Sequence, residues 1–233
     1  MKKLFLLFFV AITISGYAQN YVDYIDKINS LNKNDRQYDL CISPDKKFMA
    51  IATLSTVKII DIQNFKVVKV IPVEFEFVYL VSFLSTNDKV LIVGNNKEET
   101  SAEIYSLVDK KLIKKGNPIV SGKISKAWQQ GVFVKSENYL VGVTNEKKIF
   151  LLNCNTLEPI KTMPFTGGNG KCIENLTISK DESLIAFETT RSLGLGATLF
   201  VVDINGNLKY SKQFDGVLVG ISFSPKNELY FSE

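Results

Sequence analysis

The chain has 233 residues, of which 45% are hydrophobic, and its formal net charge is +4. This hydrophobic content is ordinary for a globular domain and excludes a disordered chain, and the basic residues are scattered among nearly as many acids, so no nucleic-acid partner is indicated. Histidine is absent, which removes the usual general base of serine and cysteine hydrolases and the commonest zinc ligand.

The first eighteen residues have the pattern of a secretory signal peptide. Lys2 and Lys3 precede an apolar run at residues 4–14, and small residues follow up to Ala18. The run is shorter than the stretch of about 20 residues that spans a bilayer. We therefore expect cleavage between Ala18 and Gln19 and a mature protein with no integral membrane segment. It is expected to be periplasmic, exposed at the cell surface or secreted.

Residues 19–37 connect this signal to the repeats. Tyr21, Tyr24, Ile25 and Ile28 lie near helical spacing, and a polar stretch at residues 32–36 follows them. The pattern favours a short helix and a linker. The alternative is a strand that this segment adds to the last blade of the repeat domain.

A polar turn that opens with serine and leads into an apolar run recurs along the chain. The clearest copy is ISPDKKFMAIAT at residues 42–53. Counted at the first apolar residue after each turn, the copies are anchored at Phe48, Val90, Tyr139, Leu184 and Leu229, with spacings of 42, 49, 45 and 45 residues. A period in the mid-forties that holds four short strands is typical of a β-propeller blade.

A second element keeps the same period. Apolar strands followed by polar turns begin at Val57, Ala102, Lys148 and Thr198, and the last copy contains the hairpin dipeptide Asn205-Gly206. The sequence therefore predicts an all-β fold over residues 38–233, a β-propeller of four-stranded antiparallel blades with four complete blades and part of a fifth. Because the last copy ends after two strands, we expect an incomplete ring. Either the natural protein continues or the reading frame is truncated.

The turn motif resembles a known group of proteins. Ser43-Pro44-Asp45, followed by Ala50, matches the blades of bacterial WD-like and YVTN-type β-propellers, and Ser224-Pro225 matches in part. The Gly-His and Trp-Asp dipeptides of eukaryotic WD repeats are absent, so the divergent bacterial type is the better match. The resemblance implies a scaffold that binds proteins, peptides or ligands, or one that accompanies an enzymatic domain.

Three cysteines are present, Cys41, Cys154 and Cys172. Cys41 and Cys154 lie in apolar runs, where a buried free thiol behaves as a small hydrophobic side chain. A disulfide between Cys154 and Cys172 is the alternative.

Three motifs invite chemical interpretations that their context does not favour. The glycine-rich segment at residues 166–172 lacks the first glycine and the final Ser or Thr of a phosphate-binding loop. Asp203, Asn205 and Asn207 alternate like calcium ligands, but no Glu closes a loop of the right length, so we expect a hairpin turn. The turn serines Ser43, Ser136, Ser179 and Ser224 have no activating histidine and are expected to shape their turns.

One face of the predicted propeller gathers its longer loops. These loops join the second to the third strand or the last strand to the next blade, and they are residues 97–101, 123–130, 167–171 and 191–196. Long loops on a rigid scaffold commonly carry recognition. We expect Trp128, Gln129, Lys171 and Arg191 to contact a partner, since Trp and Arg are favoured at binding hot spots. Packing of Trp128 at a blade junction is the alternative.

These patterns favour a non-enzymatic exported scaffold that binds a protein or peptide, with no catalytic residues, cofactor or metal. The alternative is a propeller accessory domain of a longer exported hydrolase, peptidase-like, whose catalytic part lies beyond Glu233.

Overall fold

The computed structural model describes residues 39–53, 56–96, 99–121, 131–144, 147–165, 172–190 and 196–232. Within these ranges every regular element is a β-strand, and no helix there is long and apolar enough to cross a bilayer. The predicted signal peptide (1–18) and the helix or linker (19–37) lie outside the described residues and stay predictions.

The strands form four-stranded antiparallel sheets in chain order, which we call blades. Blade 1 contains β1 (Asp39–Ile42), β2 (Phe48–Ala52), β3 (Thr56–Asp61) and β4 (Lys66–Pro72). Blade 2 contains β5 (Phe77–Phe83), β6 (Lys89–Asn95), β7 (Glu99–Ser106) and β8 (Lys111–Lys115), and the short β9 (Val120–Ser121) pairs with β7. Blade 3 contains β10 (Gly131–Lys135), β11 (Tyr139–Thr144), β12 (Lys148–Asn153) and β13 (Pro159–Pro164).

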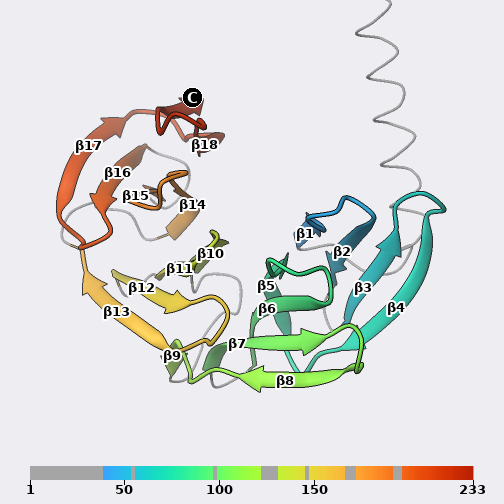
Figure 1. Cartoon of the computed structure of the whole chain (residues 1–233). Coiled ribbons are helices and arrows are strands. Elements are labelled where there is room, and N and C mark those ends of the chain that lie inside the picture. Colours follow the sequence, from blue (N-terminus) through green and yellow to red (C-terminus); the bar gives the residue numbers. More distant parts are fainter. Residues whose placement is uncertain are drawn as a thin grey trace, which may run out of the picture.

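Blade 4 contains β14 (Cys172–Ile178), β15 (Leu184–Thr190), β16 (Ala197–Asp203) and β17 (Leu208–Phe214), and β18 (Gly220–Phe223) pairs with β19 (Leu229–Ser232) as part of a fifth. Figure 1 shows the sheets arranged radially in an open arc, with the first strands innermost and the fourth strands outermost. The predicted propeller architecture, four complete blades and part of a fifth, is confirmed. Phe48, Tyr139, Leu184 and Leu229 each begin a second strand, as the repeat predicts, and Val90 is the second residue of β6.

Burial follows the position of a strand within its blade. The middle strands β7 and β15 are buried along nearly their whole length, whereas in β17 only Phe214 is buried. These two strands lie between neighbouring blades, so both of their faces are covered, and their polar residues Thr100, Glu103 and Glu188 are buried as well. The fourth strands face solvent and therefore carry many lysines.

Apolar side chains pack from one blade to the next. At the junction of blades 3 and 4, the ring of Phe187 is 4.8 Å from that of Phe165, edge to face, and 5.3 Å from that of Phe200, stacked. Phe165 follows blade 3, while the other two rings belong to blade 4. Each blade is thus stabilised mainly by its neighbours.

The serine of the repeat fixes the turn between the first and second strands. Ser179 Oγ donates to Asp181 Oδ1 at 2.6 Å and accepts the N–H of Leu184 at 2.9 Å, and Ser43 makes the same two hydrogen bonds in blade 1. The residue three positions after the serine has a left-handed backbone: φ is 61° at Lys46, 59° at Glu182 and 63° at Asn227. The expectation that these serines shape turns is confirmed.

A second repeated device closes the hairpin between the third and fourth strands. The last residue of the third strand accepts a backbone N–H of the turn through its side-chain oxygen; these residues are Asp61, Ser106, Asn153 and Asp203. A left-handed residue follows in each turn, at Phe65, Lys110, Leu157 and Gly206. The register of the fourth strand then shifts in all four complete blades, which bends the outer edge of each blade.

Candidate functional site

The predicted loop-face residues Trp128, Gln129, Lys171 and Arg191 lie outside the described residues, so their joint contact with a partner stays a prediction. The strand register in blade 4 agrees with the prediction that these loops share one face. Thr190, the last residue of β15, pairs with Ala197, and Ala197 pairs with Phe214, the last residue of β17. The connection between the second and third strands and the exit of the fourth strand therefore lie at the same end of blade 4.

Buried oxygens without hydrogen-bond partners are concentrated near that end. Among the described residues, five buried side-chain oxygens have no partner, and four of them belong to Asn95, Ser101, Thr144 and Thr189. These residues lie at or near the loop-face ends of strands in blades 2, 3 and 4. A buried polar atom without a partner costs roughly 1–3 kcal/mol, so these oxygens favour polar contacts at this end of the blades.

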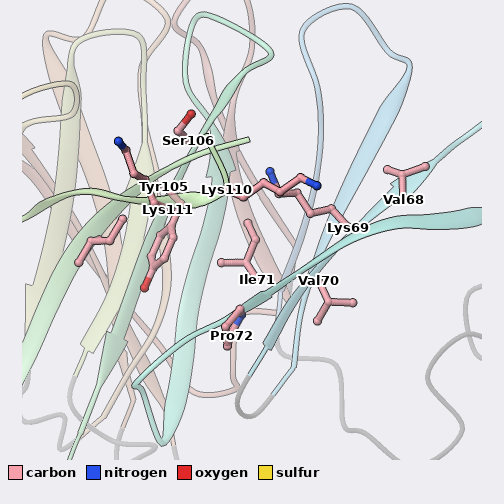
Figure 2. A pocket seen from close by; sticks show the side chains of 10 residues that line it. Val68, Lys69, Val70, Ile71, Pro72, Tyr105, Ser106, Lys110 and Lys111 are labelled. Atoms are coloured by element: carbon pink, nitrogen blue, oxygen red, sulfur yellow. The ribbon is translucent and has the colours of Figure 1, made fainter. Parts of the chain in front are cut away.

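A second candidate surface lies at the outer rim, where blade 1 meets blade 2. We call it the rim groove, a cavity of about 420 Å³ between β4 and the β7–β8 hairpin, shown in Figure 2. Its lining residues are Val68, Lys69, Val70, Ile71, Pro72, Tyr105, Ser106, Lys110, Lys111 and Leu112. The lining thus combines apolar side chains with the ammonium groups of Lys69, Lys110 and Lys111.

Local structure positions the two central lysines of the groove. Lys69 crosses from β4 to blade 2 and donates through Nζ to the carbonyl oxygen of Leu107. Lys110 occupies the left-handed position of the β7–β8 turn, which is held by the hydrogen bond from the Asp109 N–H to Ser106 Oγ at 2.9 Å. In Figure 2 the two lysine side chains extend toward each other from opposite sides of the groove.

The surroundings of Lys69 make its charged form less favourable. Partial burial and the neighbouring Lys110 ammonium lower the pKa of Lys69, while Asp109 acts in the opposite direction. In the part of the chain that the structure describes, no carboxylate lies within ion-pair distance of Lys69, Lys110 or Lys111. The groove therefore carries positive charge that its own residues do not neutralise.

A buried carboxyl group supports the inner wall of the groove. Tyr105 donates its hydroxyl to Glu103 Oε2 at 2.9 Å, and Lys115 Nζ is 3.9 Å from Glu103 Oε1. Burial raises the pKa of Glu103 and that of Tyr105. The hydrogen bond to Glu103 therefore holds the Tyr105 ring in place along this wall.

The predicted hairpin at Asp203 is confirmed in place of a calcium loop. Asp203 Oδ1 accepts the N–H groups of Asn205 and Asn207, and Oδ2 accepts Asn207 Nδ2, all at 2.9 Å. These bonds, those of Asn207 first, lower the pKa of Asp203 well below its usual range. Both carboxylate oxygens thus serve the turn, and no cluster of three or more metal-binding side chains occurs among the described residues.

Cys154 is a buried free thiol and not half of a disulfide. Its Sγ donates to the carbonyl oxygen of Glu137 at 3.1 Å. The buried-thiol expectation is therefore confirmed for Cys154. Cys41 is also a free thiol, half-buried on the inner strand β1.

Sequence reasoning did not find the rim groove. Its signal is present as lysines mixed with apolar residues at 66–71 and 110–115. Charged side chains on fourth strands also protect sheet edges from pairing, so this pattern by itself does not mark a binding site. Only the contact between β4 and the next blade brings Lys69 and Lys110 together.

No protein-family model and no curated protein matches the chain. By contrast, 1338 chains of solved structures match it. One is a chain of hydrazine synthase from Kuenenia stuttgartiensis, with a TM-score of 0.64 and 12% sequence identity. The match covers 84% of this chain and 55% of that one, so the present chain spans about half the length of its structural neighbour. The likeness is one of fold alone.

Proposed function

We propose that the chain is an exported β-propeller scaffold of the bacterial WD-like or YVTN type, which binds a protein or peptide and has no catalysis of its own. The observation that carries the proposal is the rim groove. It combines exposed apolar side chains with lysines that lack acidic partners among the described residues, where the outermost strand of blade 1 meets the outer hairpin of blade 2. In the isolated chain, the apolar side chains of this surface stay exposed, and no carboxylate of the described residues pairs with its lysines.

Further support comes from the sequence. The absence of histidine leaves the chain without the usual base for serine or cysteine nucleophiles. The leader pattern at residues 1–18 favours export. Export is tested by determining the N-terminus of the protein recovered outside the cytoplasm: a chain that starts at Gln19 supports it, and an uncleaved chain in the cytoplasm contradicts it.

Binding is tested by panning the full chain, confirmed as folded by circular dichroism, against a displayed library of random peptides. We expect enriched peptides that bind the purified protein in solution and are recovered uncleaved by mass spectrometry. If no peptide is enriched above the level of an unrelated β-protein, the scaffold proposal is wrong. Cleavage of the bound peptides would contradict the absence of catalysis.

The same peptides decide which surface binds. Trp128→Ala with Arg191→Ala removes two predicted contacts on the loop face, while Lys69→Gln with Lys110→Gln alters the rim groove. Loss of binding in the first pair supports the loop face, and loss in the second supports the groove.

A further inference from the structure

We propose that the rim groove binds an acidic peptide segment in extended conformation, with a carboxylate of that segment placed between Lys69 and Lys110. This inference rests on the proposed scaffold function and deepens it, because it names the class of partner and the residues that receive it.

The charge of the groove differs from that of the rest of the rim. The other lysines of β8, β13 and β17 have partners: Lys114 lies 2.8 Å from Glu158, Lys115 lies 3.4 Å from Glu99, Lys209 lies 3.0 Å from Asp203, Lys161 bonds Asn205, and Lys212 lies over the Phe214 ring. Among the described residues, Lys69 has one hydrogen-bond acceptor, the carbonyl oxygen of Leu107, and Lys110 and Lys111 have no hydrogen-bond or ion-pair partner. An anion between Lys69 and Lys110 would offset their mutual repulsion with two favourable interactions.

The apolar part of the groove favours a peptide over a purely polar polyanion. Val68 is 53% exposed, Val70 is 51% exposed and Leu112 is 42% exposed, whereas Ile71 is buried beneath the groove. An acidic polysaccharide or a free inorganic anion would leave these side chains in water. A peptide with alternating acidic and apolar residues would pair its carboxylates with the lysines and cover the valines with its other side chains.

The backbone of β4 offers a further contact. β4 is the outermost strand of blade 1 and, among the described strands, pairs with β3 alone. An outermost strand presents unpaired N–H and C=O groups, and an extended peptide can add to such an edge. Pro72 ends β4 and has no N–H, so it limits how far the added strand can run.

The first test measures binding by fluorescence anisotropy with the full chain. The probes are a short labelled peptide in which Asp alternates with Val, and the same peptide with Asn in place of Asp. The variants are Lys69→Gln/Lys110→Gln and the matched control Lys161→Gln/Lys212→Gln, which changes the net charge equally on blades 3 and 4. Unchanged circular dichroism and melting temperature show that each variant is folded.

We expect the acidic probe to bind the unmodified chain and the control alike, and the groove variant about tenfold more weakly. The Asn probe should bind the unmodified chain at least as weakly as the acidic probe binds the groove variant. Added salt should weaken the binding of the acidic probe. If the groove variant and the control variant both bind the acidic probe equally more weakly, the binding reflects the overall positive charge of the rim, and the proposed site is wrong. If a sulfated polysaccharide binds more tightly than the peptide, and if the groove variant loses that binding, the proposal that the partner is a peptide is wrong.

Cross-linking gives a readout that a purely structural effect of the variants would not produce. A carbodiimide activates the peptide carboxylate, which then forms an amide with a lysine within contact distance, and mass spectrometry identifies that lysine. We expect Lys69 or Lys110, and cross-links confined to other lysines would refute the placement. If library-selected peptides bind elsewhere while the acidic probe does not bind, this inference fails and the scaffold function stands. If no peptide binds at all, both fail.

Discussion

Replacement of Ser179 by alanine tests whether the repeated serine holds a blade together. Ser179 is 1% exposed, and its Oγ is the acceptor for the N–H that begins β15, at Leu184. Leaving that donor without a partner costs about 1–3 kcal/mol. The lost bond to Asp181 adds a smaller amount, because this exposed carboxylate still accepts two hydrogen bonds from Ser183. We therefore expect Ser179→Ala to lower the free energy of unfolding by about 2 kcal/mol.

The assay is thermal and urea unfolding followed by circular dichroism. For a chain of this size, about 2 kcal/mol corresponds to a fall in Tm of about 4–8 °C. Ser183→Ala is the matched control, since Ser183 is exposed and bonds the same carboxylate at 2.8 Å. It should cost less than about 0.5 kcal/mol. Equal losses in the two variants would refute a structural role for the buried hydroxyl.

Acid adds a second test of the same hydroxyl. The Ser179 hydrogen bond is the main cause that lowers the pKa of Asp181. A carboxyl group with a depressed folded-state pKa contributes stability above its unfolded pKa of about 3.9, and that contribution disappears as the pH falls through the folded pKa. The unmodified protein should therefore lose more stability than Ser179→Ala below about pH 4, so that their difference narrows. A constant difference would contradict this reasoning.

Three further predictions concern buried groups. Burial raises the pKa of Glu188, so its contribution to stability is complete below the unfolded pKa of about 4.3 and decreases as the pH rises through the folded pKa. From about pH 4 to pH 7, the Tm of the unmodified protein should therefore fall relative to that of Glu188→Gln. Parallel Tm profiles of the two proteins would refute this. Gly94→Ala would place a Cβ 2.4 Å from the Phe75 ring and should cost about 1–3 kcal/mol, whereas Gly220→Ala, with nothing within 4 Å, should be nearly neutral in the same urea titration. Burial raises the pKa of the Cys154 thiol, so Cys154 should resist a thiol reagent in the native protein and react in urea, and rapid native labelling would show that the site opens.

The aromatic contact between blades 3 and 4 explains why predictions about single residues extend beyond one blade. Phe187 is fully buried against a ring from each blade. A blade therefore depends on its neighbour for the burial of its middle strands, and a change in one blade is expected to weaken the adjoining one.

The sequence by itself determined the all-β class, the number of complete blades and, to within one residue, the start of each second strand. These properties depend on local patterns, namely a polar turn with a serine, an apolar run after it and a hairpin signal at a fixed period. The same segments contain other residues that accept a hydrogen bond from the outer hairpin turn, such as Asp61 and Ser106. A polar residue at the end of a strand is common, so the sequence by itself does not predict this role.

Only the tertiary structure decided what meets across a blade junction. Lys69 and Lys110 lie in different blades, and their approach depends on how β4 packs against the next hairpin. The carboxyl group of Glu188 likewise reaches the N–H of Leu218, thirty residues away, at 3.2 Å. Sequence periodicity fixes the order of blades but carries no information about these distances, because they arise from the angle and spacing at which neighbouring sheets pack.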